Sequence, residues 1–193
     1  YGTRTGEAFD MDLEKLEQAA RLIIEAVGDD PDREGLLETP KRFADMMAEQ
    51  FAYTAVSNED IAREFEKTFA TPENDMVVVK DISIFSHCEH HIALIYNMKA
   101  AVGYIPHGRV IGLSKIARIA DAVSKRFQIQ ERIGTDIRDI MKMVTGSPDI
   151  IVYIEGEHSC MTARGIKKPG TRTRTIASSG AFKEDSALRG EFM

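Results

Sequence analysis

Apolar residues recur at helical spacing in the first third of the chain. Between residues 12 and 27 they are separated by three and four positions, which predicts an amphipathic helix that Gly28 ends. Thr39-Pro40 predicts a second helix start, with Thr39 as the N-cap and Pro40 at the first helical position. A third, short helix is expected over 58–68, so the chain opens with a helical segment.

The pattern becomes strand-like at Met76. Segments rich in valine and isoleucine predict four strands, at 76–85, 92–105, 150–157 and 171–178. Two helices are expected between the second and third strands, one capped by Ser114 and running to about Arg126, the other over 131–145.

This order of elements predicts an α+β fold. We expect a four-stranded antiparallel sheet with two helices on one face. The chain is accordingly divided into an N-terminal helical segment, 1–70, and an α+β domain, 71–193.

Charge and composition narrow the classes of function. The 193 residues carry a net charge of −6, which disfavours non-specific nucleic-acid binding because that requires a basic surface. No apolar run reaches membrane-spanning length and no signal segment opens the chain, so we expect a cytoplasmic protein without a membrane partner. Two cysteines are too few for a disulfide scaffold, and in a reducing compartment they are more often metal-bound or catalytic.

Both cysteines lie close to histidines, in Ser86-His87-Cys88-Glu89-His90-His91 and in His158-Ser159-Cys160. Thiolate and imidazole are ligands that zinc prefers, and two cysteines with one histidine leave a fourth position open, as in catalytic zinc sites. The spacing of Cys88 and His91 puts both side chains on one side of a turn. If the third strand continues past His158, Cys160 shares a face with that histidine. His90 points elsewhere and is free for proton transfer.

Other interpretations of these residues remain open. The cysteines could be buried apolar residues or form a disulfide, and the histidines could lie on the surface. We expect no metal role for His87 or His107.

Two basic segments stand out in an acidic chain. Ser114-Lys115-Ile116-Ala117-Arg118 opens a predicted helix, where free backbone N–H groups favour an anion. Arg164-Gly165-Ile166-Lys167-Lys168 is the second segment, followed by Arg172 and Arg174. Both suit phosphate, although either could be a solvated basic face. Glu131, after Gln130, could accept two N–H groups from a guanine edge or be a surface residue at a helix start.

Several motifs, taken together, resemble the GTP cyclohydrolase I family. They occur in the family's order between about residues 35 and 180: Glu38-Thr39-Pro40-Lys41-Arg42, Cys88-Glu89-His90-His91, Gly103-Tyr104-Ile105-Pro106, Gly112-Leu113-Ser114-Lys115-Ile116-Ala117-Arg118, Gln128-Ile129-Gln130-Glu131-Arg132 and His158-Ser159-Cys160-Met161-Thr162-Ala163-Arg164-Gly165.

The resemblance implies a tunnelling fold, in which the sheets of several subunits join into a barrel. Two pentameric rings would stack as a homodecamer, with active sites at subunit interfaces. The implied reaction converts GTP and water to formate and 7,8-dihydroneopterin triphosphate, the first step of pterin and folate synthesis. Hydroxide from a zinc-activated water would add to C8 of the purine, and ring opening, a second hydrolysis, an Amadori-type rearrangement and ring closure would follow.

The resemblance also implies a role for each matching residue. Zinc, the implied cofactor, would be held by Cys88, His91 and Cys160. Proton transfer would fall to His90 and His158, and guanine binding to Glu131 with Gln130 beside it. The triphosphate would be held by Lys115, Arg118 and Arg164, with Arg42 a weaker candidate. Ser114 would contact the ribose or phosphates and assist the late rearrangement.

Two other functions compete with this interpretation. A non-catalytic module stabilised by zinc requires a fourth protein ligand, which His90 or His158 would have to supply. A nitrile reductase of queuosine synthesis shares the implied fold but uses a nucleophilic cysteine and a nicotinamide cofactor. Metal analysis and incubation with GTP separate the three.

Overall fold

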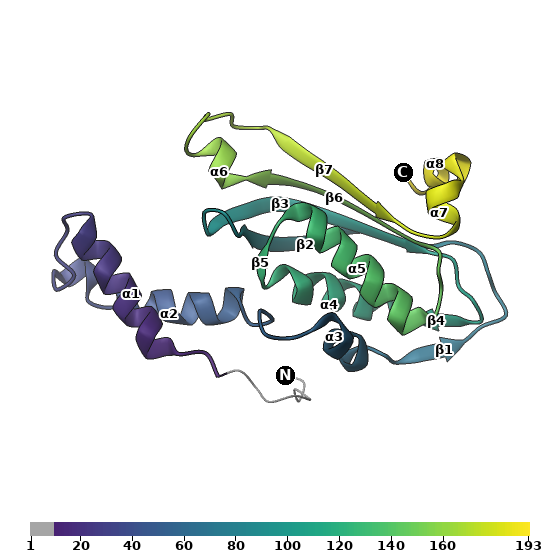
Figure 1. Cartoon of the computed structure of the whole chain (residues 1–193), viewed down its shortest axis with the longest axis horizontal. Helices are drawn as coiled ribbons and strands as arrows, with labels where there is room; N and C mark the ends of the chain where they lie inside the picture. Colours follow the sequence, from purple (N-terminus) through teal and green to yellow (C-terminus); the bar gives the residue numbers. More distant parts are fainter. Residues whose placement is uncertain (1–9) are drawn as a thin grey trace.

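The N-terminal helices form a hairpin that projects from the rest of the molecule. The computed structural model describes residues 10–193. Helices α1 (Leu13–Ala26) and α2 (Thr39–Gln50), joined through the short helix η1 (Glu34–Leu36), pack chiefly against each other (Figure 1). The predicted stop after α1 is confirmed, since Gly28 has a φ of +89° that other residues rarely adopt.

The predicted cap of α2 is wrong by one residue. Glu38 holds the cap position without a side-chain hydrogen bond, and Thr39 and Pro40 are the first two helical residues. Proline fits either position because the first backbone N–H groups of a helix have no partner within the helix.

Helix α3 (Asn58–Glu64) is shorter than predicted and packs against the main body rather than the hairpin. The chain then enters β1 (Thr68–Ala70), which pairs with β4 (Arg109–Ile111) in a small separate sheet. The division at residue 70 stays a prediction, and residues 1–9 of that segment lie outside the described residues.

The four predicted strands are present, but the sheet has five. Its order is β5-β2-β3-β6-β7, formed by β2 (Val77–Cys88), β3 (Ala93–Tyr104), β5 (Phe127–Gln128), β6 (Ile150–His158) and β7 (Arg172–Ser178). The expectation of a four-stranded, wholly antiparallel sheet is therefore wrong, because β5 runs parallel to β2. A strand of two residues is too short to give a periodic pattern.

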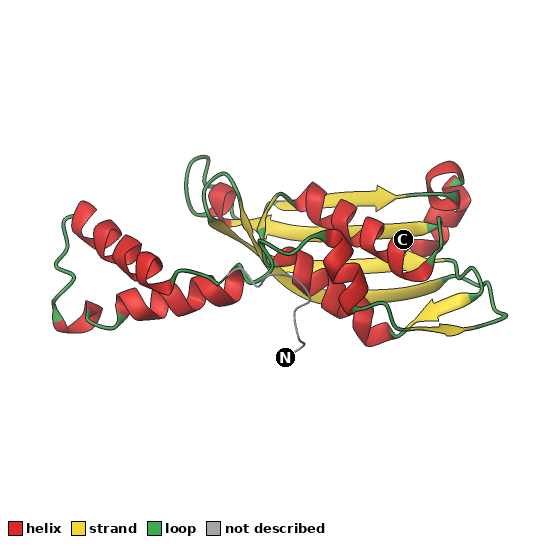
Figure 2. Ribbon diagram, turned by 60° about the horizontal axis from the view of Figure 1, so that its bottom comes forward, coloured by secondary structure: helices red, strands yellow, loops and turns green. Residues whose placement is uncertain are grey.

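Two helices cover one face of this sheet, as predicted (Figure 2). Helix α4 (Leu113–Ser124) begins after Gly112, so the prediction that Ser114 caps it is wrong; Ser114 is its second residue. Helix α5 (Gln130–Thr145) ends at Gly146, whose φ of +70° reverses the chain. The main core lies between helices and sheet, and its fully buried members include Ile116, Ile137 and Ile154.

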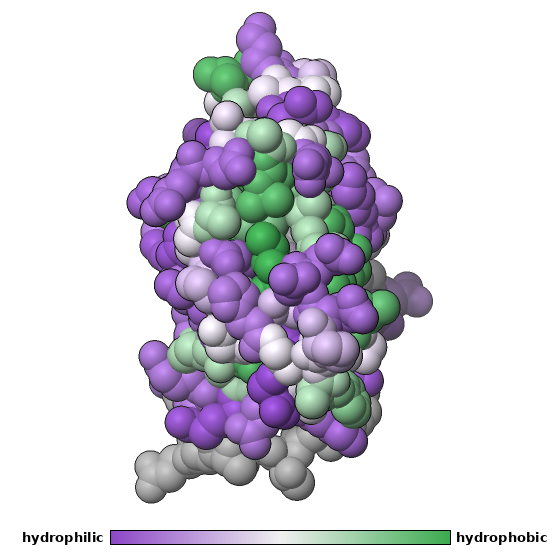
Figure 3. Space-filling model, turned by 90° about the vertical axis from the view of Figure 1, so that its right-hand side faces the viewer, coloured by the Kyte–Doolittle hydropathy of each residue, from purple (hydrophilic) through white to green (hydrophobic). Residues whose placement is uncertain are grey.

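The C-terminal segment builds a second, smaller core on the opposite face of the sheet. Helices α7 (Ala181–Glu184) and α8 (Ser186–Phe192), which the sequence analysis did not anticipate, bury Phe182 and Phe192 beside Ile151. A Cβ atom at Gly103 would lie 2.7 Å from the Phe192 ring, so glycine is required for this close packing. Figure 3 shows this end of the molecule, where a strip of apolar side chains is bordered by polar ones.

Within residues 10–193, no helix combines the length and the apolar character needed to cross a membrane.

Candidate metal centre and substrate site

The two Cys-His motifs meet at one end of the sheet. Strand β2 ends at Cys88, and the following turn carries His91; β6 ends at His158, and the short helix α6 (Ser159–Thr162) carries Cys160. Strand β3 lies between β2 and β6 and aligns the two ends, because Ala93 pairs with Cys88 and Ile95 with His158. The condition that the strand continues past His158 is not met; Cys160 lies on a helical turn, which directs its thiol toward the site instead.

The predicted zinc ligands lie together. The ligand atoms of Cys88, His91 and Cys160 are all within 4.8 Å of one another, and Cys88 Sγ lies 4.0 Å from His91 Nδ1. Among residues 10–193 this is the one group of histidine, cysteine and acidic side chains close enough to hold a metal ion. Cys88 is buried, Cys160 is partly buried and His91 is exposed, so the group opens toward solvent.

These residues fit a zinc ion. Tetrahedral zinc with bonds of about 2.0–2.3 Å needs ligand atoms about 3.5–3.8 Å apart, slightly closer than they lie here. Both cysteines are free thiols. Burial, and then the neighbouring thiol of Cys88, raise the pKa of Cys160. A divalent cation would reverse this effect, because it stabilises both thiolates at once.

His158 is held by a buried glutamine. Gln130, the first residue of α5, is 1% exposed, and its Oε1 lies 2.9 Å from His158 Nε2. Its Nε2 donates to the backbone oxygens of Ile154 and Thr173, at 3.1 and 3.0 Å. These two bonds fix the orientation of the amide, so Oε1 faces the histidine and His158 Nε2 must be the donor.

Burial lowers the pKa of His158, and the nearby carboxylate of Glu131 opposes this shift. Glu131 follows Gln130 in the first turn of α5, and its side chain is exposed. His90 is also exposed, in the turn between the two ligands from β2. Two proton-transfer candidates and the guanine-binding candidate therefore share the end of the sheet that holds the metal group.

Two polar contacts lie beside the metal group, one an ion pair and the other a hydrogen bond. Glu89 and Arg132 form a two-bond pair, with Arg132 Nη1 2.7 Å from Oε2 and Nη2 3.2 Å from Oε1. This pair lowers the pKa of Glu89. Arg164 Nη1 lies 3.2 Å from His91 Nε2. Arg164, predicted to bind phosphate, thus lies at the metal centre.

The other predicted phosphate ligands lie away from the metal group. The last residue of α4, Ser124, lies near the metal group, because its carbonyl accepts a hydrogen bond from Ser86 of β2. Ser114, at the start of α4, lies about 15 Å away from Ser124 along the helix axis. Lys115 is directed over the ring of Phe65, with Nζ 5.3 Å from its centroid, and Arg118 is exposed. One chain therefore presents these residues at the end of the sheet opposite the metal group.

Arg42, the weaker phosphate candidate, is exposed in the first turn of α2, on the projecting hairpin. His87 lies beside the metal group, but its ring packs against Phe51 at 5.2 Å between centroids, and burial lowers its pKa.

Sequence reasoning missed the Glu89–Arg132 pair and the bonds of Gln130. Glu89 lies inside the first Cys-His motif and Arg132 directly follows Glu131, so their opposite charges were visible. Nothing in the sequence indicated that the two segments meet, because β5, which brings them together, is too short to predict.

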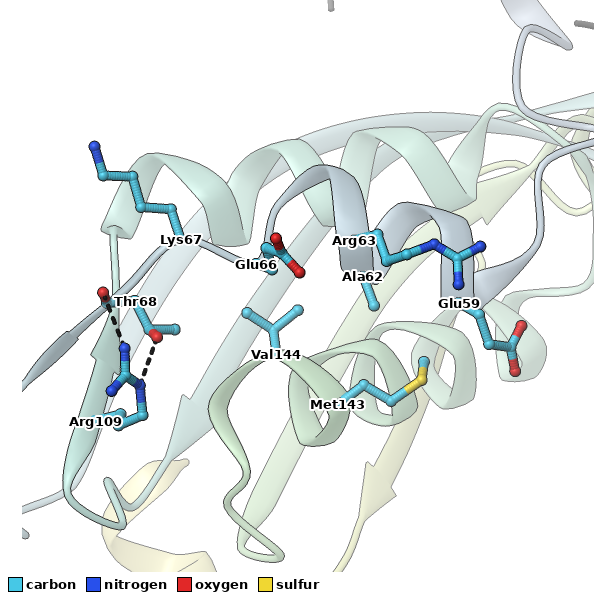
Figure 4. A pocket seen from close by; sticks show the side chains of 9 residues that line it. All are labelled: Glu59, Ala62, Arg63, Glu66, Lys67, Thr68, Arg109, Met143 and Val144. Carbon is cyan, nitrogen blue, oxygen red and sulfur yellow. Dashed lines mark hydrogen bonds between the residues drawn. The ribbon is translucent and has the colours of Figure 1, made fainter. Parts of the chain in front are cut away.

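A cavity of about 720 Å³ lies away from this centre (Figure 4). Its walls come from α3, β1, β4 and the end of α5, and at one edge Arg109 donates a 2.7 Å bond to Thr68 of the neighbouring strand. None of the residues predicted to act in the site lines it. The cavity therefore lies apart from the predicted site residues.

Comparison with known proteins agrees with the motifs and the metal group. The family model for GTP cyclohydrolase I matches residues 16–193. The chain belongs to the GTP cyclohydrolase I family. It is thus an enzyme of pterin and folate synthesis, whose first step converts GTP to dihydroneopterin triphosphate.

Close relatives of the enzyme include two from clostridia, both called GTP cyclohydrolase 1. That of Clostridium acetobutylicum is 57% identical over 95% of this chain and 96% of its own length. That of Clostridium beijerinckii is 56% identical over 94% of this chain and 95% of its own length. Among solved structures, the apo form of an archaeosine synthase QueF-Like is similar over 57% of this chain and 96% of its own, with 18% identity and a TM-score of 0.44.

Proposed function

We propose that the enzyme holds zinc with Cys88, His91 and Cys160 and there hydrolyses GTP to formate and 7,8-dihydroneopterin triphosphate. The observation that carries this proposal is the meeting of the three ligand atoms beside the His158–Gln130 pair. When bound, zinc would lower the pKa of a water molecule to about 7 and so supply a nucleophile at neutral pH.

His158 would exchange protons with the purine through Nδ1. Its Nε2 is committed as a donor to Gln130, so Nδ1 is the nitrogen left to accept or return a proton. Gln130 would therefore act chiefly by fixing this tautomer, in addition to bordering the guanine. His90, which lies on the turn between Cys88 and His91, would be the second proton-transfer residue.

Glu131 would select guanine. Its exposed carboxylate can accept two N–H groups from the base, which adenine does not offer in the same arrangement. Arg164 would hold phosphate. If zinc were held through His91 Nδ1, Nε2 would carry the ring hydrogen and could not accept a bond from Arg164. The guanidinium of Arg164 would then be available to an anion.

The remaining phosphate ligands would come from another subunit. Ser114, Lys115 and Arg118 lie at the end of the sheet opposite the metal group, so a neighbouring chain must supply them if all act on one GTP. Arg42, on the projecting hairpin, would likewise be supplied to the site by another subunit. In such a site Ser114 would contact the ribose or phosphates.

Assembly into a ring would bring the metal group of one subunit close to the phosphate-binding residues of another. The sheet has open edges, and exposed edges pair with other chains unless they are covered. We expect sheets to join into a barrel, with two pentamers stacked as a decamer. The apolar strip in Figure 3, at the end where α4 begins, would be covered in that assembly. The enzyme would act in the cytoplasm, where its cysteines stay reduced.

The direct test is incubation of the zinc-loaded enzyme with GTP, followed by oxidation and detection of a fluorescent pterin, with formate measured in parallel. We expect one formate for each pterin formed. The variant Glu131→Gln should keep its zinc and bind GTP more weakly, because an amide presents a donor to one guanine N–H. Zinc-loaded enzyme that yields neither product would refute the proposed function.

A further inference from the structure

Two segments distant in sequence are joined beside the metal group. One is the turn 88–91, which holds two metal ligands, and the other is the first turn of α5, which holds Gln130 and Glu131. A backbone bond already links them, since the N–H of Glu89 donates to the oxygen of Gln128 at 2.9 Å. This bond continues the pairing of β5 with the end of β2.

The side chains of Glu89 and Arg132 add a second link. Their two bonds are parallel, which restrains both the separation and the orientation of the groups they join. Glu89 directly follows the ligand Cys88, and Arg132 directly follows Glu131. The link thus connects the residue next to a metal ligand with the residue next to the guanine-binding candidate.

Stability gives a weak reason for this pair. The side chains of Arg132 and Glu89 are 44% and 35% exposed, and ion pairs at such exposure add little to folding. A cation in the first turn of a helix is also disfavoured by the helix dipole. Within α5 the arginine is attracted to Asp136, but its two hydrogen bonds go to the carboxylate on the metal turn.

We infer that Glu89 and Arg132 are positioning residues that set the placement of the metal turn relative to the base-binding turn of α5. The inference rests on the proposed function, because that function puts the metal and the purine on these two turns. A displacement of about 1 Å between reacting groups can reduce turnover by about 100-fold. A restraint that contributes little to folding can therefore contribute much to turnover.

The first test compares two arginines of the same helix. Arg132→Met removes the link, and Arg138→Met is the matched control, because Arg138 also makes a two-bond pair, with Asp139, away from the metal group. We measure zinc content, kcat per bound zinc, KM for GTP and the melting temperature. We expect kcat per bound zinc to fall about 10- to 100-fold in Arg132→Met, with KM changed less. Arg138→Met should stay within about twofold of the parent, because a surface pair of this kind contributes little.

The second test exchanges the charges. Glu89→Arg and Arg132→Glu should each lower kcat per bound zinc. The double variant should have a kcat per bound zinc at least about tenfold above that of the less active single variant, as expected for coupled residues. Arg132→Lys keeps the positive charge but cannot make the two parallel bonds of a guanidinium. Its kcat per bound zinc should lie between those of the parent and Arg132→Met.

The outcomes separate this inference from the proposed function. A parent enzyme that forms no pterin refutes the function and with it the inference. An active parent with equal kcat per bound zinc in Arg132→Met and Arg138→Met overturns the inference alone. Zinc loss in Arg132→Met with unchanged kcat per bound zinc also overturns it, since the pair would then retain the metal without positioning it.

Discussion

At the scale of single residues, the site depends on which atom faces which. Gln130 shows this most clearly, because its sequence position beside Glu131 indicates a base contact. Its burial and its bonds to Ile154 and Thr173 direct the amide oxygen to His158. The residue therefore has a defined structural task, whatever it also contributes to base binding.

The metal group allows a prediction at this scale. Cys88→Ser and Cys160→Ser should each lose zinc and turnover together, because a hydroxyl is a poor substitute for a thiolate ligand. Zinc content by elemental analysis and pterin formation check this. His107→Gln is the control, since His107 lies at the other end of the sheet with Nε2 2.8 Å from Asp149. Full zinc and full turnover in either serine variant would remove that cysteine from the ligand set.

At the scale of elements, one arginine joins three segments. Arg126, just after α4, donates to the backbone oxygens of Tyr53 and Val56, at 3.1 and 2.6 Å, and to Asn58 at the start of α3. It also pairs with Asp136 of α5 at 3.1 Å. Burial lowers the pKa of Arg126, although Asp136 partly opposes this. Arg126 thus connects the segment between α2 and α3 to helices α4 and α5.

Arg126→Met should destabilise the enzyme by about 3–5 kcal/mol, because it removes the cation paired with the largely buried carboxylate of Asp136 and the guanidinium bonds to two backbone carbonyl groups. Arg138→Met, which breaks a more exposed pair, should cost no more than about 1 kcal/mol. Urea unfolding at one fixed protein concentration compares them. Equal midpoints for the two variants would show that the Arg126 junction adds no stability.

At the scale of the whole molecule, the main feature is that the predicted site residues of one chain lie in two separate groups. Metal, proton-transfer and guanine-binding candidates occupy one end of the sheet, and Ser114, Lys115 and Arg118 the other. The projecting α1–α2 hairpin exposes Leu22, Ile23 and Val27, which a second chain could cover (Figure 1).

This separation predicts complementation between inactive subunits. Cys88→Ser and Lys115→Ala subunits, co-expressed with different tags, should regain up to about a quarter of parental activity if each site uses two chains of a closed ring that mix at random. Cys88→Ser with Glu131→Gln should show no recovery beyond the sum of its members, because both residues come from the same end. Equal behaviour of the two mixtures would contradict a shared site.

The sequence by itself determined the local elements and the chemical types. Periodicity indicated α1, α4, α5 and the four long strands, because helices and strands impose different spacings on buried residues. The candidate ligand set could be predicted because the chain has only two cysteines and each lies close to a histidine.

The tertiary structure decided what depends on contacts between distant segments. The two-residue strand β5, the buried bonds of Gln130 and the Glu89–Arg132 link all require segments that no local pattern relates. It also decided that Cys88 and Glu131 lie at one end of the sheet whereas Lys115 lies at the other. Spacing along a chain fixes which face of an element a residue occupies, but only the packing of elements fixes which faces meet.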